Sequence, residues 1–190
     1  MTSSSGGGVI YVALLRGINV GGNNMVSMKE LKAQFERLGF TDVSTYINSG
    51  NLLFRATEPD PRKIEEHIDA MLARKFHLNG RTVVRNHDEM KRLVKTISKR
   101  WGTPDATVRY NVIFLRHTLD SKKTVQELGA DLDVDDVVYC PGALLWSLRN
   151  DVAARSTLMK KMSKPLYKDT TVRNLNTTLK VFALMEQMAA

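Results

Sequence analysis

Residues 43–55 read VSTYINSGNLLFR, and the fold of the first half follows from this stretch. Two short runs of β-branched and apolar residues, Val43–Ile47 and Leu52–Arg55, lie on either side of the polar string NSGN at 48–51. Polar residues with a glycine between two such runs are typical of a β-hairpin. The stretch therefore predicts two neighbouring antiparallel strands.

The segments around this hairpin extend the pattern to β-α-β-β-α-β. Upstream, Val9–Leu15 is an apolar run that predicts a buried strand, and a capping box at Ser27 begins an amphipathic helix. Downstream, Asp60 precedes a proline that starts a second helix, and Arg81–Arg85 predicts a fourth strand. This order is that of a ferredoxin-like module.

The second half of the sequence repeats parts of the first. Residues 110–116 (YNVIFLR) are similar to residues 11–16 (YVALLR), and a helix from about Ser121 and strands at 136–140 and 144–149 are predicted after them. We expect an α+β fold of two ferredoxin-like (βαββαβ-type) halves packed together, with a helical C-terminal tail. The expected parts are a flexible head at 1–8, a first half at 9–87, a connecting helix at 88–107, and a second half at 108–190 whose tail has two helical stretches separated by a polar loop.

Composition narrows the class of protein. Of 190 residues 43% are hydrophobic and 25% are charged, which is ordinary for a globular domain. The longest unbroken apolar run has only the length of a strand and residues 1–8 do not read as a signal peptide, so we expect a cytoplasmic protein. The single Cys140 excludes disulfides within the chain, and the four histidines lack metal-ligand spacing, so no metal and no cofactor is predicted.

The glycine-rich stretch that begins at Arg16 is the first candidate for anion binding. Its glycines let backbone amides turn toward an anion, Arg16 offers a bidentate donor, and Asn19 and Asn24 can orient an oxygen. The stretch matches neither the Walker pattern nor the dinucleotide-binding pattern. The alternative interpretation is a wide turn whose asparagines hydrogen-bond their own backbone.

The second candidate is the polar stretch 170–180. Asn176 or Thr177 is predicted to cap the final helix, which leaves Arg173 and Asn174 just outside its positive end, where a phosphate or carboxylate binds well. The alternative is a structural role in which Arg173 makes a salt bridge and Asn174 holds the loop. Ser49 lacks the surroundings of a nucleophile and is interpreted as a turn residue.

A basic segment allows a third interpretation. The net charge is +8, and residues 81–110 carry eight basic and three acidic groups, including Lys91, Arg92, Lys95 and Lys99. Such a segment suits a nucleic-acid surface, but a solvated helix face has the same composition. No nucleic-acid recognition motif accompanies it.

Three strings carry a family resemblance: YVALLRGINVGG (11–22), TYINSGN (45–51) and TVRNLNT (171–177). They resemble a bacterial family known as domain of unknown function 1697, and the resemblance extends over nearly the whole chain from Val9. It implies two ferredoxin-like halves and no established activity, substrate or catalytic residue. The sequence departs from the family at Ser27, where proline is frequent, and at Leu175, where tryptophan is frequent.

The leading hypothesis is a polar pocket formed by the 16–24 loop, the 48–51 turn and the 171–177 loop. It would bind a small phosphate-bearing metabolite between Arg16 and Arg173. Its predicted binding residues are Arg16, Asn19, Gly21, Gly22, Asn24, Tyr46, Ser49, Asn51, Arg173, Asn174 and Thr177. The alternatives are a non-specific nucleic-acid binder that uses the positive segments 81–101 and 155–173, and a non-catalytic protein-interaction module. The sequence leaves open whether the protein is an enzyme.

Overall fold

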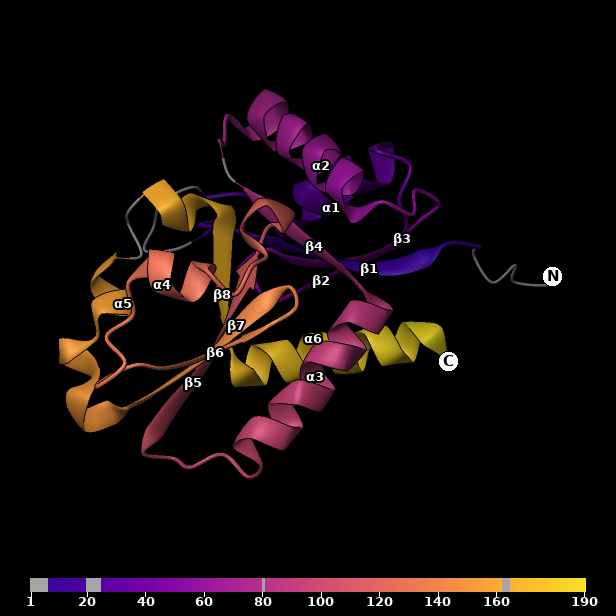
Figure 1. The fold of residues 1–190 in the computed structure, drawn as a ribbon. Coiled ribbons are helices and arrows are strands. Elements are labelled where there is room, and N and C mark those ends of the chain that lie inside the picture. The colour runs from indigo at the N-terminus through magenta and orange to yellow at the C-terminus, as the bar shows by residue number, and fades with distance from the viewer. Residues whose placement is uncertain (1–6, 20–24, 80, 162–164) are drawn as a thin grey trace. The chain divides into compact units, whose positions relative to one another are not determined.

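The computed structural model describes residues 7–19, 25–79, 81–161 and 165–190 (Figure 1). These residues form two four-stranded antiparallel sheets with the strand orders β2-β3-β1-β4 and β6-β7-β5-β8. Each order is that of a ferredoxin-like sheet, so the predicted α+β class with two ferredoxin-like halves is confirmed. No helix in the described ranges has the length and apolar character needed to cross a membrane.

In the first sheet, β1 (Val9–Leu15) lies between β3 (Asn51–Ala56) and β4 (Thr82–Asn86), and β2 (Thr41–Tyr46) pairs with the outer side of β3. Helices α1 (Met28–Arg37) and α2 (Pro61–Phe76) cover one face of this sheet (Figure 1). The predicted caps form, because Ser27 accepts a hydrogen bond from the amide of Glu30 and Asp60 accepts one from the amide of Arg62.

The second sheet repeats this pairing. Strand β5 (Val108–Leu115) lies between β7 (Ala143–Arg149) and β8 (Thr170–Asn174), with β6 (Asp136–Cys140) outside β7. Short helices cover one face, where their apolar side chains join the core: η1 (His117–Leu119), α4 (Thr124–Leu128), η2 (Asn150–Arg155), α5 (Thr157–Lys161) and η3 (Pro165–Asp169).

One 15-residue helix follows the fourth strand of each sheet: α3 (His87–Trp101) after β4 and α6 (Leu175–Ala189) after β8. By the density of internal contacts, the chain divides into a first unit of residues 1–88 and 181–190 and a second unit of residues 89–180. The last helix therefore begins in the second unit and ends in the first.

The predicted loop at 171–177 is wrong. Residues 170–174 are strand β8, and α6 begins directly after it at Leu175. Thr170 and Thr171 are buried and β-branched, and the strand pairs antiparallel with β5. The polar side chains of this segment do not follow a strand pattern, and its backbone hydrogen bonds are made with β5, about sixty residues earlier in the chain.

Candidate functional site

The loop after β1 is joined to the β2–β3 turn by one asparagine. The Nδ2 atom of Asn19 donates to the carbonyl oxygens of Val26 (3.0 Å) and Asn48 (2.9 Å), and its Oδ1 atom accepts from the amide of Val26 at 2.7 Å. Two of the three predicted segments thus meet in the first unit. The predicted site residues Gly21, Gly22 and Asn24 lie outside the described residues.

The β2–β3 turn is held by Asn51, which is fully buried. Its Nδ2 atom donates to the carbonyl of Tyr46 and to the hydroxyl of Ser49, both at 3.1 Å. Gly50 has φ +75°, and its carbonyl accepts the amide of Leu15 at 2.8 Å. The amides of Asn19 and Asn51 are therefore engaged within the protein and shape the backbone.

Arg173 lies on β8 in the second unit, whereas Arg16 belongs to the first. Its Nη1 atom donates to the Thr171 hydroxyl (2.8 Å) and to the Val172 carbonyl (2.9 Å). Burial lowers the pKa of Arg173 to about 10, so the guanidinium remains charged at neutral pH. The structure thus shows a buried cation held by its own strand.

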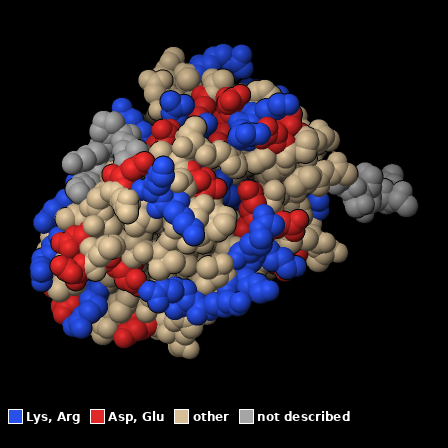
Figure 2. Space-filling model, in the orientation of Figure 1, with Lys and Arg blue, Asp and Glu red and all other residues tan. Residues whose placement is uncertain are grey.

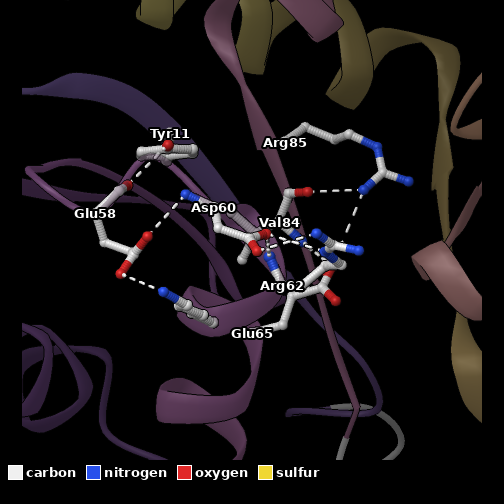
Figure 3. Close-up of polar contacts among 8 residues, drawn as sticks. Tyr11, Glu58, Asp60, Arg62, Glu65, Val84 and Arg85 are labelled. Carbon is white, nitrogen blue, oxygen red and sulfur yellow. Dashed lines mark hydrogen bonds and ion pairs between the residues drawn. The ribbon is translucent and has the colours of Figure 1, made fainter.

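Arg85 occupies the corresponding place in the first unit. Arg85 pairs with Val12 on β1, as Arg173 pairs with Val112 on β5. Arg85 donates to the carbonyl of Val84 at 2.7 Å and lies 4.0 Å from a carboxylate oxygen of Glu65. Figure 3 draws these residues together. The same Glu65 oxygen accepts the amide of Val84 at 2.9 Å.

Sequence reasoning missed this correspondence, although a signal was present. The string Val-Arg-Asn occurs at 84–86 and again at 172–174, each time at the end of a fourth strand and directly before a 15-residue helix. In both copies the asparagine stands where the helix begins. The repeated Val-Arg-Asn string therefore marks the end of the strand and the start of the helix, a boundary that the hydrophobic periodicity of the sequence did not show.

The start of α6 is capped by Asn174. Its Oδ1 atom accepts the amide of Thr177 at 2.8 Å, and its carbonyl accepts the Thr178 hydroxyl at 3.0 Å. The predicted caps were Asn176 or Thr177, so the observed cap is two or three residues earlier, and both predicted residues lie inside the helix. Asn174 and Thr177 thus both act at the positive end of the helix dipole.

A hollow of about 400 Å³ opens at this helix start. Asn174, Leu175 and Asn176 line it from β8 and α6, and Arg109 and Asn111 line it from β5. The guanidinium of Arg109 is oriented by a hydrogen bond from Nε to Oδ1 of Asn150 at 2.9 Å. All these residues belong to the second unit, so this end of its sheet combines amide donors with a positive charge.

A carboxylate completes the lining of this hollow, which we call the α6 hollow. Asp105 accepts hydrogen bonds from the amide (2.7 Å) and the hydroxyl (2.8 Å) of Thr107, both at Oδ1. These bonds lower the pKa of Asp105, first through the amide and then through the hydroxyl. The side chain therefore stays ionised and acts as a hydrogen-bond acceptor.

The first unit has a hollow of about 330 Å³ at the corresponding place, lined by the start of β1 and by Asn86 and His87. Arg55 also lines it, and this guanidinium donates to Asp42, Gly8 and the carbonyl of Met188. Its cation is therefore more fully engaged than Arg109 in the α6 hollow.

The residues that the structure describes give no support for a metal site or for a nucleophilic residue. No group of three or more histidine, cysteine or acidic side chains there is placed to hold a metal ion. The buried carboxylate of Asp135 accepts from the Trp146 indole (3.0 Å) and the Ser156 hydroxyl (2.6 Å), a structural arrangement. Cys140 is buried and faces the carbonyl of Ala143 at 3.5 Å.

The repeated strand order and the paired strand-to-helix junctions define a two-unit, ferredoxin-like α+β protein. The chain belongs to the family described as "Protein of unknown function (DUF1697)", which matches residues 9–146. The family resemblance of the sequence is thereby confirmed.

Among solved structures, the chain is similar to a conserved bacterial protein from Streptococcus pneumoniae, with a TM-score of 0.80 and 23% sequence identity. The similarity covers 93% of this chain and 98% of that one. At this identity the match supports the fold alone. No curated protein matches the chain.

Proposed function

We propose that the protein binds a small, hydroxyl-bearing phosphate in the α6 hollow. The observation that carries the proposal is the convergence of the capped start of α6 and Arg109 on one hollow of ligand size. Helix N-termini bind phosphate because their first amides lack intrahelical acceptors and the helix dipole is positive there. Arg109 adds a bidentate donor to the same place.

The lining also suggests what the phosphate carries. Asp105 keeps its charge and has a second carboxylate oxygen, Oδ2, that can accept a ligand hydroxyl. Tyr110, Pro104 and Val108 supply apolar surface beside it. A sugar phosphate or a nucleoside monophosphate matches this combination better than inorganic phosphate does.

The α6 hollow replaces the first-unit segments as the preferred place for the anion. Asn19 and Asn51 direct their amide donors at backbone or neighbouring side chains, which favours a structural role for both. We also propose that the two units arose by duplication of one segment. The matching strand orders and the repeated Val-Arg-Asn string support this origin.

A thermal-shift and calorimetric titration tests the proposal, with inorganic phosphate, ribose 5-phosphate and adenosine monophosphate as ligands. At one hundred times the dissociation constant, a ligand stabilises by about 2.7 kcal/mol, which raises Tm by a few degrees. Arg109→Gln should abolish the shift. The matched control is Arg62→Gln, because Arg62 is also exposed and hydrogen-bonded through Nε.

A second variant separates ligand binding from folding. Asn174→Asp keeps an oxygen that can cap α6 but adds a negative charge to the hollow, so Tm without ligand should hold while phosphate affinity falls. Equal shifts in the native protein and in both hollow variants would refute the site. No shift with any of the three phosphates would favour an interaction module, and pull-down experiments would then be appropriate.

A further inference from the structure

A second hollow of the second unit lies beside α3 and takes no part in the proposed phosphate site. It measures about 330 Å³ and opens between α3 and the β6–β7 turn. Leu93, Cys140 and Pro141 form apolar walls, and Arg92 and Lys95 stand at the same hollow. We call it the α3 hollow. A flat, mostly apolar group attached to a phosphate fits such a lining.

The exposed face of α3 is basic. Lys91, Arg92, Lys95 and Lys99 are all exposed, and none of them makes an ion pair within the described part of the chain. Arg100 differs, because both oxygens of the Asp136 carboxylate bind it at 2.8 and 2.7 Å. Lys and Arg side chains gather in Figure 2 where Figure 1 draws α3.

These cations are arranged as a row. Lys91, Lys95 and Lys99 are four residues apart, so they share one line along the helix at intervals of about 6 Å. Apolar residues Met90, Leu93 and Ile97 occupy the buried side. A regular row of unpaired ammonium groups suits a ligand whose negative charges also repeat along a line.

Two acidic side chains, Asp120 and Glu89, also line the α3 hollow. The Oδ1 atom of Asp120 accepts from the Tyr139 hydroxyl (2.9 Å) and from the amide of Gly142 (2.8 Å). Those bonds hold the carboxylate against the β6–β7 turn. Burial and then the Asp120 hydrogen bond raise the pKa of Tyr139, which keeps that donor protonated.

We propose that α3 and the α3 hollow bind single-stranded nucleic acid, with phosphates along the lysine row and one base in the hollow. Single strands present bases that are free to leave the stack, whereas a duplex keeps its bases paired. The site is independent of the α6 hollow, since the two share no lining residue. The sequence lacks a base-reading motif, so binding depends on charge and on the burial of one base against the apolar walls rather than on base identity.

Fluorescence anisotropy with a labelled twelve-nucleotide oligothymidylate tests the lysine row. Lys91→Gln combined with Lys95→Gln should weaken binding at least tenfold at 50 mM salt. It should also lower the slope of log K against log salt by about 1.4, because each phosphate contact to a single strand contributes about 0.7. The matched control is Lys29→Gln with Lys75→Gln, which removes the same charge from exposed helix positions of the first unit.

Three further probes test the strand and the hollow. An abasic strand of equal length should bind about tenfold more weakly, and a duplex of the same length should also bind more weakly, because neither places a base in the hollow. Equal binding of the abasic strand, or of the duplex, would overturn the proposal. So would equal losses in the two lysine pairs. Arg109→Gln should leave oligonucleotide binding unchanged, which distinguishes this site from the phosphate site.

Discussion

Glu65 and Arg85 show at the scale of single residues how a buried charge can serve the fold. Their side chains are almost fully buried, and one Glu65 oxygen accepts the amide of Val84 while lying 4.0 Å from Arg85. Asp69, one turn further along α2, accepts the amide of Thr82 in the same way at 2.8 Å. Because β4 is an edge strand, these carboxylates cover amides that would otherwise invite another strand.

The first prediction follows from this arrangement. Glu65→Ala should lower the free energy of unfolding by about 3 kcal/mol, because it removes the carboxylate partner of a buried cation and the acceptor of a buried amide. Glu66→Ala, one position along the same helix and exposed, should change it by less than about 0.5 kcal/mol. Urea unfolding of both variants measures the difference. Similar effects of the two substitutions would contradict a structural role for the pair.

The second prediction concerns alkaline pH. Burial, and then the negative charge of Asp135, raise the pKa of Tyr167 to about 12. Between pH 10 and pH 12 the unfolded chain releases this proton while the folded chain keeps it, so Tyr167 makes the free energy of unfolding fall with pH. The slope of this fall approaches about 1.4 kcal/mol per pH unit. The stability that Tyr167 contributes is fully present below pH 10 and is lost as the pH rises through the folded-state pKa.

The comparison that isolates this effect is Tyr167→Phe. Arg173 acts in the opposite sense over the same range, because its lowered pKa means that the unfolded chain holds the extra proton. The wild type should therefore lose stability relative to Tyr167→Phe as pH rises from 10 to 12, measured by denaturant unfolding at each pH. Parallel curves for the two proteins would show that Tyr167 titrates normally.

Individual site residues were only partly predictable. That Asn174 and Thr177 lie at a helix start follows from the sequence, since asparagine and threonine are common caps. The roles of Asn19 and Asn51 as backbone partners depend on Val26, Asn48 and Tyr46 being brought close by tertiary folding. Arg109 was missed altogether, because nothing local in the sequence shows that the start of β5 faces the start of α6.

At the scale of the secondary-structure elements, turns and caps determine where each strand and helix ends. The β2–β3 turn requires glycine at position 50 for two reasons, a φ of +75° and a Cβ that would lie 2.8 Å from the Cβ of Leu15. Gly39, which follows α1, has a similar φ of +87° but open space around it. Substitutions at these two glycines therefore distinguish the cost of a left-handed backbone from the cost of a steric overlap.

The third prediction uses that pair. Gly39→Ala should cost about 1 kcal/mol of stability through the left-handed backbone alone. Gly50→Ala should cost about 1 to 3 kcal/mol more, because Leu15 belongs to the central strand and cannot move without disturbing the sheet. Thermal unfolding of both variants gives the comparison. Equal costs would mean that the turn can shift away from β1.

Elements with strong local patterns were predicted well. Strands β1 and β6 match their predicted bounds, and β3, β4 and β7 differ by one residue at one or both ends. Strand β8 was missed because its side chains are mostly polar and its stability comes from pairing with β5. The short helices between β7 and β8 were also poorly predicted, since η2 and η3 are 3-10 turns without an amphipathic period.

At the scale of the whole molecule, the end of the last helix belongs to the unit that the start of the chain forms. Residues 181–190 belong to the first unit, where His87 contacts Glu186 and stacks on Phe182 with ring centroids 5.8 Å apart. Arg55 also donates to the carbonyl of Met188. Val181 and Met185 are almost completely buried. This segment is therefore an integral part of the first unit.

The fourth prediction is a truncation. A chain that ends at Lys180 loses two fully buried apolar side chains, each worth roughly 1.5–3 kcal/mol, and should lose several kcal/mol of stability. A chain that ends at Met188 retains them and the Arg55 contact, so its Tm should change little. Calorimetric scans of both measure the effect. An unchanged transition in the shorter chain would show that residues 181–190 contribute nothing to the first unit.

The membership of α6 in both units also bears on synthesis. A ribosome makes residues 89–180, the whole second unit, before it makes residues 181–190. The first unit is begun first, yet it is completed only after every residue of the second has been joined to the chain. A nascent chain carrying residues 1–88 alone therefore lacks one segment of its unit, and chaperones that recognise apolar surface have that interval in which to bind it.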